Sequence, residues 1–279
     1  MRRFLFQALL IGSMSASSYA DTCQTDDFTT FISGKEQCLV MRRFGSETPK
    51  TMVVWLHGDV SSGGPANYHF RPAEQFARET NAKELLSIAL VRPGYPDGAG
   101  NSSSVALLNT GRQDHYTKIN ITEVASAIER LRNRFKPERV FIVGHSGGAA
   151  TAAVMVGLFP GLVQGAILVA CPCDLVAWRS GRRPWSASEN PTGWVSQVPL
   201  QTIVYALTGN QDDNTPPQLA IDYVAKLRSV GVTAEFQLLE NESHNSAFRS
   251  PAVTQAVLKL IESHPQYHAA RDAPQASRP

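Results

Sequence analysis

Val140-Phe141-Ile142-Val143-Gly144-His145-Ser146-Gly147-Gly148 is the stretch of sequence that decides the fold. Its apolar first half predicts a buried strand, and the small residues that follow predict an abrupt turn into a helix. Such a turn strains its corner residue, and glycines on either side let the two backbones pass without collision. We therefore expect Ser146 to stand exposed at the carboxyl edge of a sheet. The positive end of the helix, with the Gly147 backbone N–H, would then face a developing oxyanion.

Short apolar runs alternate with amphipathic stretches along the rest of the chain. This alternation predicts an α/β fold with a mostly parallel, twisted sheet and helices on both faces. The expected strands cover residues 51–56, 85–91, 140–143, 165–170, 202–207 and 232–239, with an earlier edge strand at residues 39–44.

Three further helices are indicated by spacing and by end signals. Helical periodicity recurs at Val124, Ala127, Ile128, Leu131 and Phe135. Asn120, with Glu123 three residues later, resembles a capping box at the start of this helix. Pro216-Pro217 predicts the start of a second helix, which ends before Gly231, and residues 252–261 predict a last one.

Two polar loops supply candidate partners for Ser146. A serine hydroxyl needs a base within hydrogen-bond reach and a carboxylate that orients this base. His244 follows the last expected strand and Asp212 follows the one before it, so both are expected at the sheet edge that carries Ser146. The order Ser, Asp, His matches one of the known triad arrangements. Asp213 stays open as an alternative acid, and Asp174 is a more remote one.

Taken together, these motifs resemble the α/β-hydrolase-fold serine hydrolases over essentially all of the chain after residue 20, most specifically from Val140 to His244. The segment from Gly209 to Pro217 and the elements after it are similar to dienelactone-hydrolase-like esterases and to the catalytic domain of the prolyl oligopeptidase family. The resemblance implies three catalytic roles, namely nucleophile for Ser146, acid for Asp212 and general base for His244. It implies no cofactor, and it leaves no room for the propeller that screens substrates in prolyl oligopeptidases.

The resemblance also places a second oxyanion donor in the loop after residues 51–56. In the resembled families the residue after His-Gly supplies a backbone N–H, which maps onto Asp59 after His57-Gly58. A carboxylate here departs from the commoner glycine-rich or apolar version of the loop. Because an ionised carboxylate aimed at an oxyanion raises the barrier, the Asp59 side chain must point elsewhere or pair with a cation.

One segment, residues 172–200, differs in composition from its surroundings. It holds three tryptophans and three arginines, namely Trp178, Trp185, Trp194, Arg179, Arg182 and Arg183. Two interpretations stay open: a helix and loop that pack the indoles against the core, or a short wall over a pocket. In the second, Trp178 and Arg179 contact substrate, and Tyr95 is a further candidate. A short or absent cap suits small or medium esters, and the arginines would favour a carboxylate-bearing one.

The first 20 residues have the features of a signal peptide: Arg2 and Arg3, an apolar run, and Ser18-Tyr19-Ala20 before Asp21. We expect export to a secreted or periplasmic location, a hydrolase domain over residues 21–263 and a loose tail over residues 264–279. The apolar run is too short for the roughly 20 residues of a membrane-spanning helix.

Without the two leader arginines, the chain has 24 basic and 24 acidic residues. This balance argues against a nucleic-acid partner, because phosphate binding needs clustered positive charge.

The four cysteines suit an oxidising compartment. Three pairings are possible; we favour Cys23 with Cys38 and Cys171 with Cys173, while two free thiols at the second pair stay open. No spacing resembles a metal cage. The sequence thus predicts a serine hydrolase that acts on a small ester, with a secreted peptidase or amidase for short peptides, or a binding protein on a hydrolase scaffold, as alternatives. It does not fix the oligomeric state.

Overall fold

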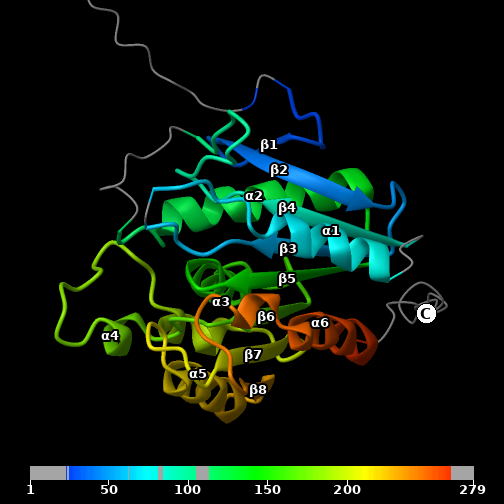
Figure 1. Cartoon of the computed structure of the whole chain (residues 1–279). Coiled ribbons are helices and arrows are strands. Elements are labelled where there is room, and N and C mark those ends of the chain that lie inside the picture. Colours follow the sequence, from blue (N-terminus) through cyan, green and yellow to red (C-terminus); the bar gives the residue numbers. More distant parts are fainter. Residues whose placement is uncertain (1–22, 24, 62, 81–83, 105–112, 265–279) are drawn as a thin grey trace, which may run out of the picture.

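An eight-stranded sheet forms the centre of the part of the chain that the computed structural model describes, namely residue 23 and residues 25–61, 63–80, 84–104 and 113–264 (Figure 1). The strand order is β1-β2-β4-β3-β5-β6-β7-β8. The pairings β1 with β2 and β2 with β4 are antiparallel, and the others are parallel. The strands are β1 (Phe31–Ser33), β2 (Cys38–Gly45), β3 (Thr51–Leu56), β4 (Leu85–Leu90), β5 (Arg139–His145), β6 (Gly165–Val169), β7 (Ile203–Gly209) and β8 (Thr233–Leu239).

Helices cover both faces of the sheet, as the alternation of apolar and amphipathic segments predicts. One face packs against α2 (Lys118–Phe135), α3 (Gly147–Leu158) and α5 (Pro217–Ser229), and the other packs against α1 (Phe70–Glu79) and α6 (Pro251–Ser263). Strand β3 is apolar throughout because its side chains alternate between two buried faces. Val54 packs in the core between the sheet and α2, α3 and α5, and Trp55 packs in the core between the sheet and α1 and α6. Burial of each such side chain contributes about 2 kcal/mol.

Three shorter helices complete the described part of the fold, namely α4 (Leu175–Trp178) and the 3-10 helices η1 (Pro191–Gln197) and η2 (Ala247–Arg249). Helix α4 follows the end of β6 and η2 follows the end of β8, whereas η1 packs against α3 at Gly157 and precedes β7. The segment from α4 through η1 is the tryptophan-rich segment of the sequence.

The strands predicted from sequence are confirmed, with ends that differ by at most two residues. Strand β1 and helix α1 were not expected. β1 has three residues, which is too short for a visible alternation, and α1 buries only Ala73, Phe76 and Ala77, two of which are alanines. The leader, residues 1–20, and the tail beyond residue 264 lie outside the described residues.

The capping box expected at Asn120 and Glu123 is wrong. The N-cap of α2 is Thr117, whose hydroxyl accepts the Asn120 N–H at 3.2 Å. Glu123 lies one turn further on, is 1 % exposed, and accepts the backbone N–H groups of Glu36 and Gln37 at 3.0 Å each. The carboxylate therefore ties α2 to the turn between β1 and β2, a long-range contact that no local pattern reveals.

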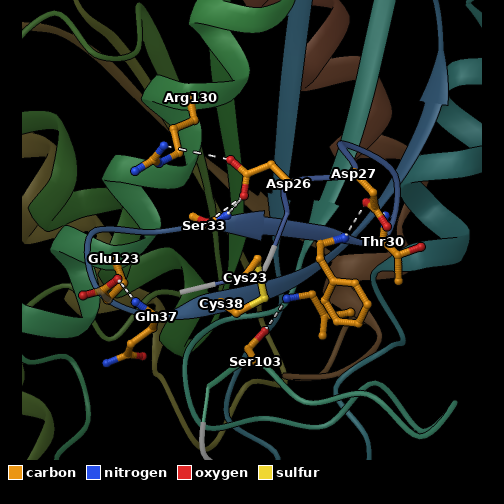
Figure 2. Close-up of a disulfide and its surroundings, with 12 residues drawn as sticks. Cys23, Asp26, Asp27, Thr30, Ser33, Gln37, Cys38, Ser103, Glu123 and Arg130 are labelled. Atoms are coloured by element: carbon orange, nitrogen blue, oxygen red, sulfur yellow. Dashed lines mark hydrogen bonds and ion pairs between the residues drawn. A yellow bond between two sulfur atoms is a disulfide. The ribbon is translucent and has the colours of Figure 1, made fainter. Parts of the chain in front are cut away.

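The sheet edge at β1 and β2 is anchored by a disulfide and by buried polar contacts (Figure 2). Cys23 is bonded to Cys38 at the start of β2. Asp26 accepts the Ser33 N–H at 2.7 Å. A second disulfide joins Cys171 to Cys173, directly after β6. Among the described residues, no helix is long and apolar enough to cross a membrane.

Candidate active site

The turn between β5 and α3 holds Ser146 in a backbone conformation that few side chains adopt, with φ 51° and ψ −117°. Backbone contacts on both sides require glycine. A Cβ on Gly144 would lie 2.4 Å from the Gly148 carbonyl oxygen, and one on Gly148 would lie 2.5 Å from the His57 carbonyl oxygen. The Ser146 N–H donates to the Val169 carbonyl at 2.8 Å, which fixes the turn to β6.

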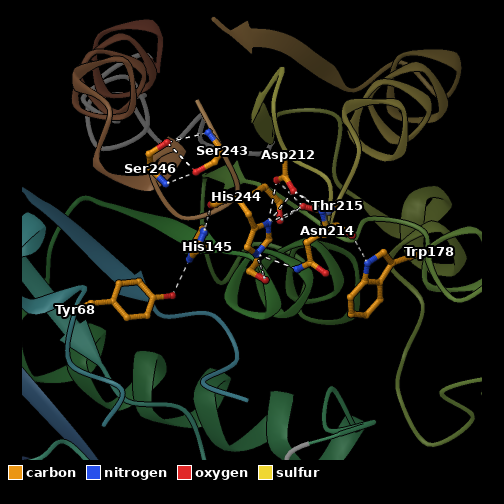
Figure 3. A network of polar contacts seen from close by, with 11 residues as sticks. Tyr68, His145, Trp178, Asp212, Asn214, Thr215, Ser243, His244 and Ser246 are labelled. Atoms are coloured by element: carbon orange, nitrogen blue, oxygen red, sulfur yellow. Dashed lines mark hydrogen bonds and ion pairs between the residues drawn. The ribbon is translucent and has the colours of Figure 1, made fainter. Parts of the chain in front are cut away.

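His244 and Asp212 lie side by side in the loops that follow β8 and β7 (Figure 3). His244 Nε2 lies 2.9 Å from Ser146 Oγ, and His244 Nδ1 donates to Asp212 Oδ2 at 2.9 Å. With Nδ1 protonated, Nε2 carries the lone pair that accepts the serine proton, and the Asn214 side-chain amide lies 3.2 Å from the same nitrogen. The structure thus brings together three side chains that are 32 to 98 positions apart in the sequence.

The neighbouring acid candidates have other surroundings. Asp212 is 4 % exposed, whereas Asp213 is exposed and lines the pocket in front of Ser146. Asp174 caps α4 by accepting the Val176 N–H at 3.1 Å, and it pairs with Lys226 at 3.4 Å. Of these three carboxylates, only that of Asp212 contacts the His244 ring in the described part of the chain.

Hydrogen bonds keep Asp212 ionised. Burial raises the pKa of this carboxyl, but the hydrogen bonds from His244 and from the Thr215 backbone N–H outweigh burial, so the pKa lies below its ordinary value of 3.8. Thr215 also donates its hydroxyl to Asp212 Oδ2 at 2.8 Å. The carboxylate is therefore a fixed negative charge behind His244.

A second hydrogen-bonded chain supports the site from the other side. Tyr68 donates its hydroxyl to His145 Nδ1 at 2.7 Å and accepts the Gly58 N–H. His145 Nε2 donates to the His244 carbonyl at 2.9 Å. Burial lowers the pKa of His145 to about 4, so this ring is neutral near pH 7. This series of hydrogen bonds connects the loop after β3, the serine turn and the His244 loop.

Gly147 and Asp59, the two expected oxyanion donors, are neighbours in space. A Cβ on Gly147 would lie 2.4 Å from Asp59 Oδ1, and one on Gly58 would lie 2.8 Å from Ser146 Cβ. The Asp59 carboxylate is paired: Arg92 Nη2 lies 2.6 Å from Oδ1, and the Tyr116 hydroxyl donates to Oδ2 at 2.5 Å. The Asp59 side chain is thus paired with a cation, as the sequence analysis requires for a carboxylate next to an oxyanion.

A pocket of about 950 Å³ opens in front of Ser146. Its walls include Trp178, Trp185 and Arg179 from the α4 segment, and Asp213 and Arg249 from the loops after β7 and β8. The two indole rings meet edge to face at 5.0 Å, and the Arg179 guanidinium lies 5.2 Å from the Trp185 ring centroid. This segment is thus a wall of the pocket, while Trp194 packs against the core.

Tyr95 does not line this pocket, contrary to the expectation that it contacts substrate. Its ring is fully buried, and its hydroxyl donates to Asp59 Oδ1 at 3.1 Å. The side chains of the turn after β4 point inward here, because Arg92 and Tyr95 both donate hydrogen bonds to the Asp59 carboxylate.

Sequence reasoning missed three residues around the site, namely Tyr68, Arg92 and Tyr116. Neither tyrosine lies in a motif, and Arg92 begins the turn Arg92-Pro93-Gly94-Tyr95, in which only Tyr95 is a candidate for the site. One signal was available: a carboxylate in the position of Asp59 demands a nearby cation, and Arg92 follows a parallel strand that ends at the same sheet edge.

Fold and site together define an α/β-hydrolase serine hydrolase. A model of the prolyl oligopeptidase family matches residues 112–266, more than half of the 279 residues, and the chain belongs to this family. The comparison with curated proteins gives no match.

Solved structures with the same fold include peptidases and esterases. Pyrococcus horikoshii acylaminoacyl peptidase is similar with a TM-score of 0.64 and 11 % identity, over 86 % of this chain and 42 % of that one. Est1E from Butyrivibrio proteoclasticus, bound to ferulic acid, gives 0.63 and 12 % over 84 % of this chain and 100 % of that one. Pyrococcus furiosus esterase Pf2001 gives 0.61 and 12 % over 84 % and 88 %. The chain spans about two fifths of the acylaminoacyl peptidases, and at these identities the likeness shows the fold alone.

Proposed function

We propose that the chain is an exported serine hydrolase that cleaves carboxylic esters with Ser146, His244 and Asp212 as its catalytic triad. The observation that carries the proposal is the continuous contact from Ser146 Oγ to His244 Nε2 at 2.9 Å and from His244 Nδ1 to Asp212 Oδ2 at 2.9 Å. In this proposal residues 21–263 form the hydrolase domain, preceded by a signal peptide and followed by a loose tail.

The reaction follows from this geometry. Ser146 Oγ attacks the ester carbonyl carbon while its proton passes to His244 Nε2. The intermediate collapses, the carbon–oxygen bond to the alcohol breaks, and His244 returns the proton to the departing oxygen. Water then attacks the acyl-enzyme by the same route and releases the carboxylic acid and free Ser146. Asp212 stays ionised throughout and stabilises the imidazolium that forms in both steps.

The carbonyl oxygen gains negative charge in each step, and in this proposal the backbone N–H groups of Gly147 and Asp59 stabilise it. Gly147 begins α3, so its N–H adds to the positive end of that helix. The Asp59 N–H lies in the loop that passes against Ser146. Removing one such donor typically costs about 100- to 1000-fold in rate.

The pocket favours small or medium esters that have an aromatic or carboxylate group. Trp178 and Trp185 offer aromatic surface, and Arg179 offers a guanidinium that no carboxylate of the described residues pairs with. The structure of Est1E with ferulic acid supplies a precedent in the same fold for an aromatic carboxylic acid. No residue role in this proposal calls for a cofactor.

A peptidase or amidase is the second candidate, favoured by the match to the prolyl oligopeptidase family. The same triad serves both reactions, because the acyl-enzyme is identical and only the leaving group differs. A p-nitrophenyl ester and a p-nitroanilide with the same acyl group separate the two. We expect turnover of the ester to exceed that of the anilide by more than about 100-fold; equal or greater turnover of the anilide would establish the peptidase.

Covalent labelling tests the proposal itself. A fluorophosphonate is expected to label the purified chain on Ser146, and Ser146→Ala should lose the label and at least about 10⁴-fold of esterase activity. Ser229→Ala, at the exposed end of α5, serves as the matched serine control and should retain both. An unlabelled but folded wild-type chain would instead indicate a binding protein on a hydrolase scaffold.

A further inference from the structure

The Asp59 carboxylate lies against the residue whose N–H is the proposed oxyanion donor. Asp59 Oδ1 and the Tyr116 hydroxyl occupy the space next to Gly147, at 2.4 Å and 2.7 Å from where a Cβ on that residue would be. An unpaired negative charge at this position opposes an oxyanion forming beside Gly147 and Asp59. The site therefore requires that the charge of Asp59 be cancelled.

Arg92 is placed to do this. Its guanidinium lies 2.6 Å from Asp59 Oδ1, and the two side chains are only 4 % and 17 % exposed, so water screens the pair weakly. Burial lowers the pKa of Arg92, but Tyr95 and Asp59 raise it by more, so the guanidinium stays charged. Tyr95 and Tyr116 add neutral donors to the same carboxylate.

Arg92 also holds the loop by its backbone. The Arg92 N–H donates to His57 Nε2 at 2.9 Å, and His57 Nδ1 donates to the Gly58 carbonyl at 2.6 Å. The loop is thus held on both sides of Gly58: His57 through the Arg92 main chain, and Asp59 through the Arg92 side chain. This arrangement fixes the peptide unit between Gly58 and Asp59, which carries the Asp59 N–H.

We propose that Arg92 is a positioning residue for acyl transfer, which cancels the charge of Asp59 and directs the Asp59 backbone N–H toward the oxyanion. The inference rests on the proposed function and extends it to a residue that touches neither substrate nor triad. A purely structural ion pair would look the same in the folded protein, but it would respond differently when the two charges are removed one at a time.

A double-mutant cycle with Arg92→Gln and Asp59→Asn distinguishes the two roles. In Arg92→Gln the Asp59 carboxylate loses its cation beside the oxyanion, and kcat for a p-nitrophenyl ester should fall about 100-fold with KM changed less than threefold. Asp59→Asn keeps an oxygen that accepts from Arg92 and Tyr116 and should lose less than tenfold. The double variant should recover at least tenfold over Arg92→Gln. A double variant as slow as Arg92→Gln would overturn the proposal.

Two controls protect the interpretation. Arg42→Gln removes another, partly buried ion pair, Arg42 with Asp97 at 2.8 Å, away from the pocket, and should leave kcat within twofold. If Arg92→Gln does not fold, the double variant is compared with Asp59→Asn: less than a tenfold difference supports the proposal and a 100-fold difference overturns it. A wild-type chain that neither turns over esters nor accepts the fluorophosphonate would refute the proposed function itself, an outcome separate from any of these.

Discussion

Two turns at the same edge of the sheet meet at Ser146, and they are built in different ways. The turn from β5 to α3 is shaped by its own backbone: a Cβ on Gly144 or Gly148 would lie within 2.5 Å of a backbone oxygen, and Ser146 has the strained backbone conformation at the corner. The loop after β3 is shaped by side chains of distant residues, which hold Gly58 and Asp59 from outside.

The two regions differ in how far apart in the sequence the residues that determine them lie. Five consecutive residues specify the first turn. The second depends on contacts over 10 positions to Tyr68, 33 to Arg92 and 57 to Tyr116. A backbone-built turn is intolerant of any added atom, whereas a side-chain-built loop tolerates volume changes but depends on charge and hydrogen bonding. Variants in the two regions should therefore fail by different routes.

The largest expected effect is that of Gly148→Ala. Its Cβ would lie 2.5 Å from the His57 carbonyl oxygen and 2.6 Å from that of Leu56, so the backbones of α3 and β3 must separate. We expect the free energy of unfolding to fall by at least about 3 kcal/mol, the upper end of overpacking costs, with loss of esterase activity. Urea denaturation followed by tryptophan fluorescence measures this change.

Gly193→Ala is the matched control, because a Cβ there would meet nothing within 4 Å. Its unfolding free energy should stay within about 0.5 kcal/mol of wild type. If Gly148→Ala behaved like this control, close backbone contact would not be what shapes the serine turn.

The same distinction explains how much of the molecule the sequence predicts. Strand positions, the α/β class and the serine turn follow from local patterns, and the loops after β7 and β8 follow from the rule that parallel strands end at one edge. The support of Asp59 by Arg92 and Tyr116 does not, since nothing in the neighbourhood of Tyr116 indicates a partner 57 residues away. Glu123 shows the converse error: a local pattern suggested a cap where a long-range contact had taken the carboxylate.

Acid should weaken the serine turn through His145. The folded-state pKa of this buried ring is about 4, below the ordinary value of 6.5, so below pH 6.5 the unfolded chain binds a proton that the folded chain does not. Stability from this group is complete above pH 6.5 and is lost as pH falls toward 4. Between pH 6.5 and pH 5 the loss amounts to about 2 kcal/mol.

His145→Gln isolates this contribution. The Gln side chain can still donate to the His244 carbonyl and accept from Tyr68, but it does not titrate. The difference in unfolding free energy between wild type and variant, measured from pH 8 to pH 5, should be constant above pH 7 and shrink by about 2 kcal/mol below it. Parallel curves over the whole range would show that His145 binds its proton equally in both states.

The smallest expected effect concerns Tyr68, a side chain that contacts both regions. Tyr68→Phe removes the acceptor of the Gly58 N–H and the donor to His145 Nδ1, while the ring packing against Phe248 at 5.7 Å is kept. A hydrogen bond of this kind contributes about 1 kcal/mol, so kcat should fall about fivefold with KM nearly unchanged. As a control, Tyr205→Phe should retain wild-type kcat, because the Tyr205 hydroxyl contacts Ser263 at 3.4 Å outside the pocket.

Tyr68 acts on the Gly58 side of the loop and Arg92 on the Asp59 side. Tyr68→Phe should therefore lower kcat by the same factor when it is introduced into the wild type and into Asp59→Asn. A deficit that vanished in Asp59→Asn would show instead that both residues act through one shared displacement of the loop.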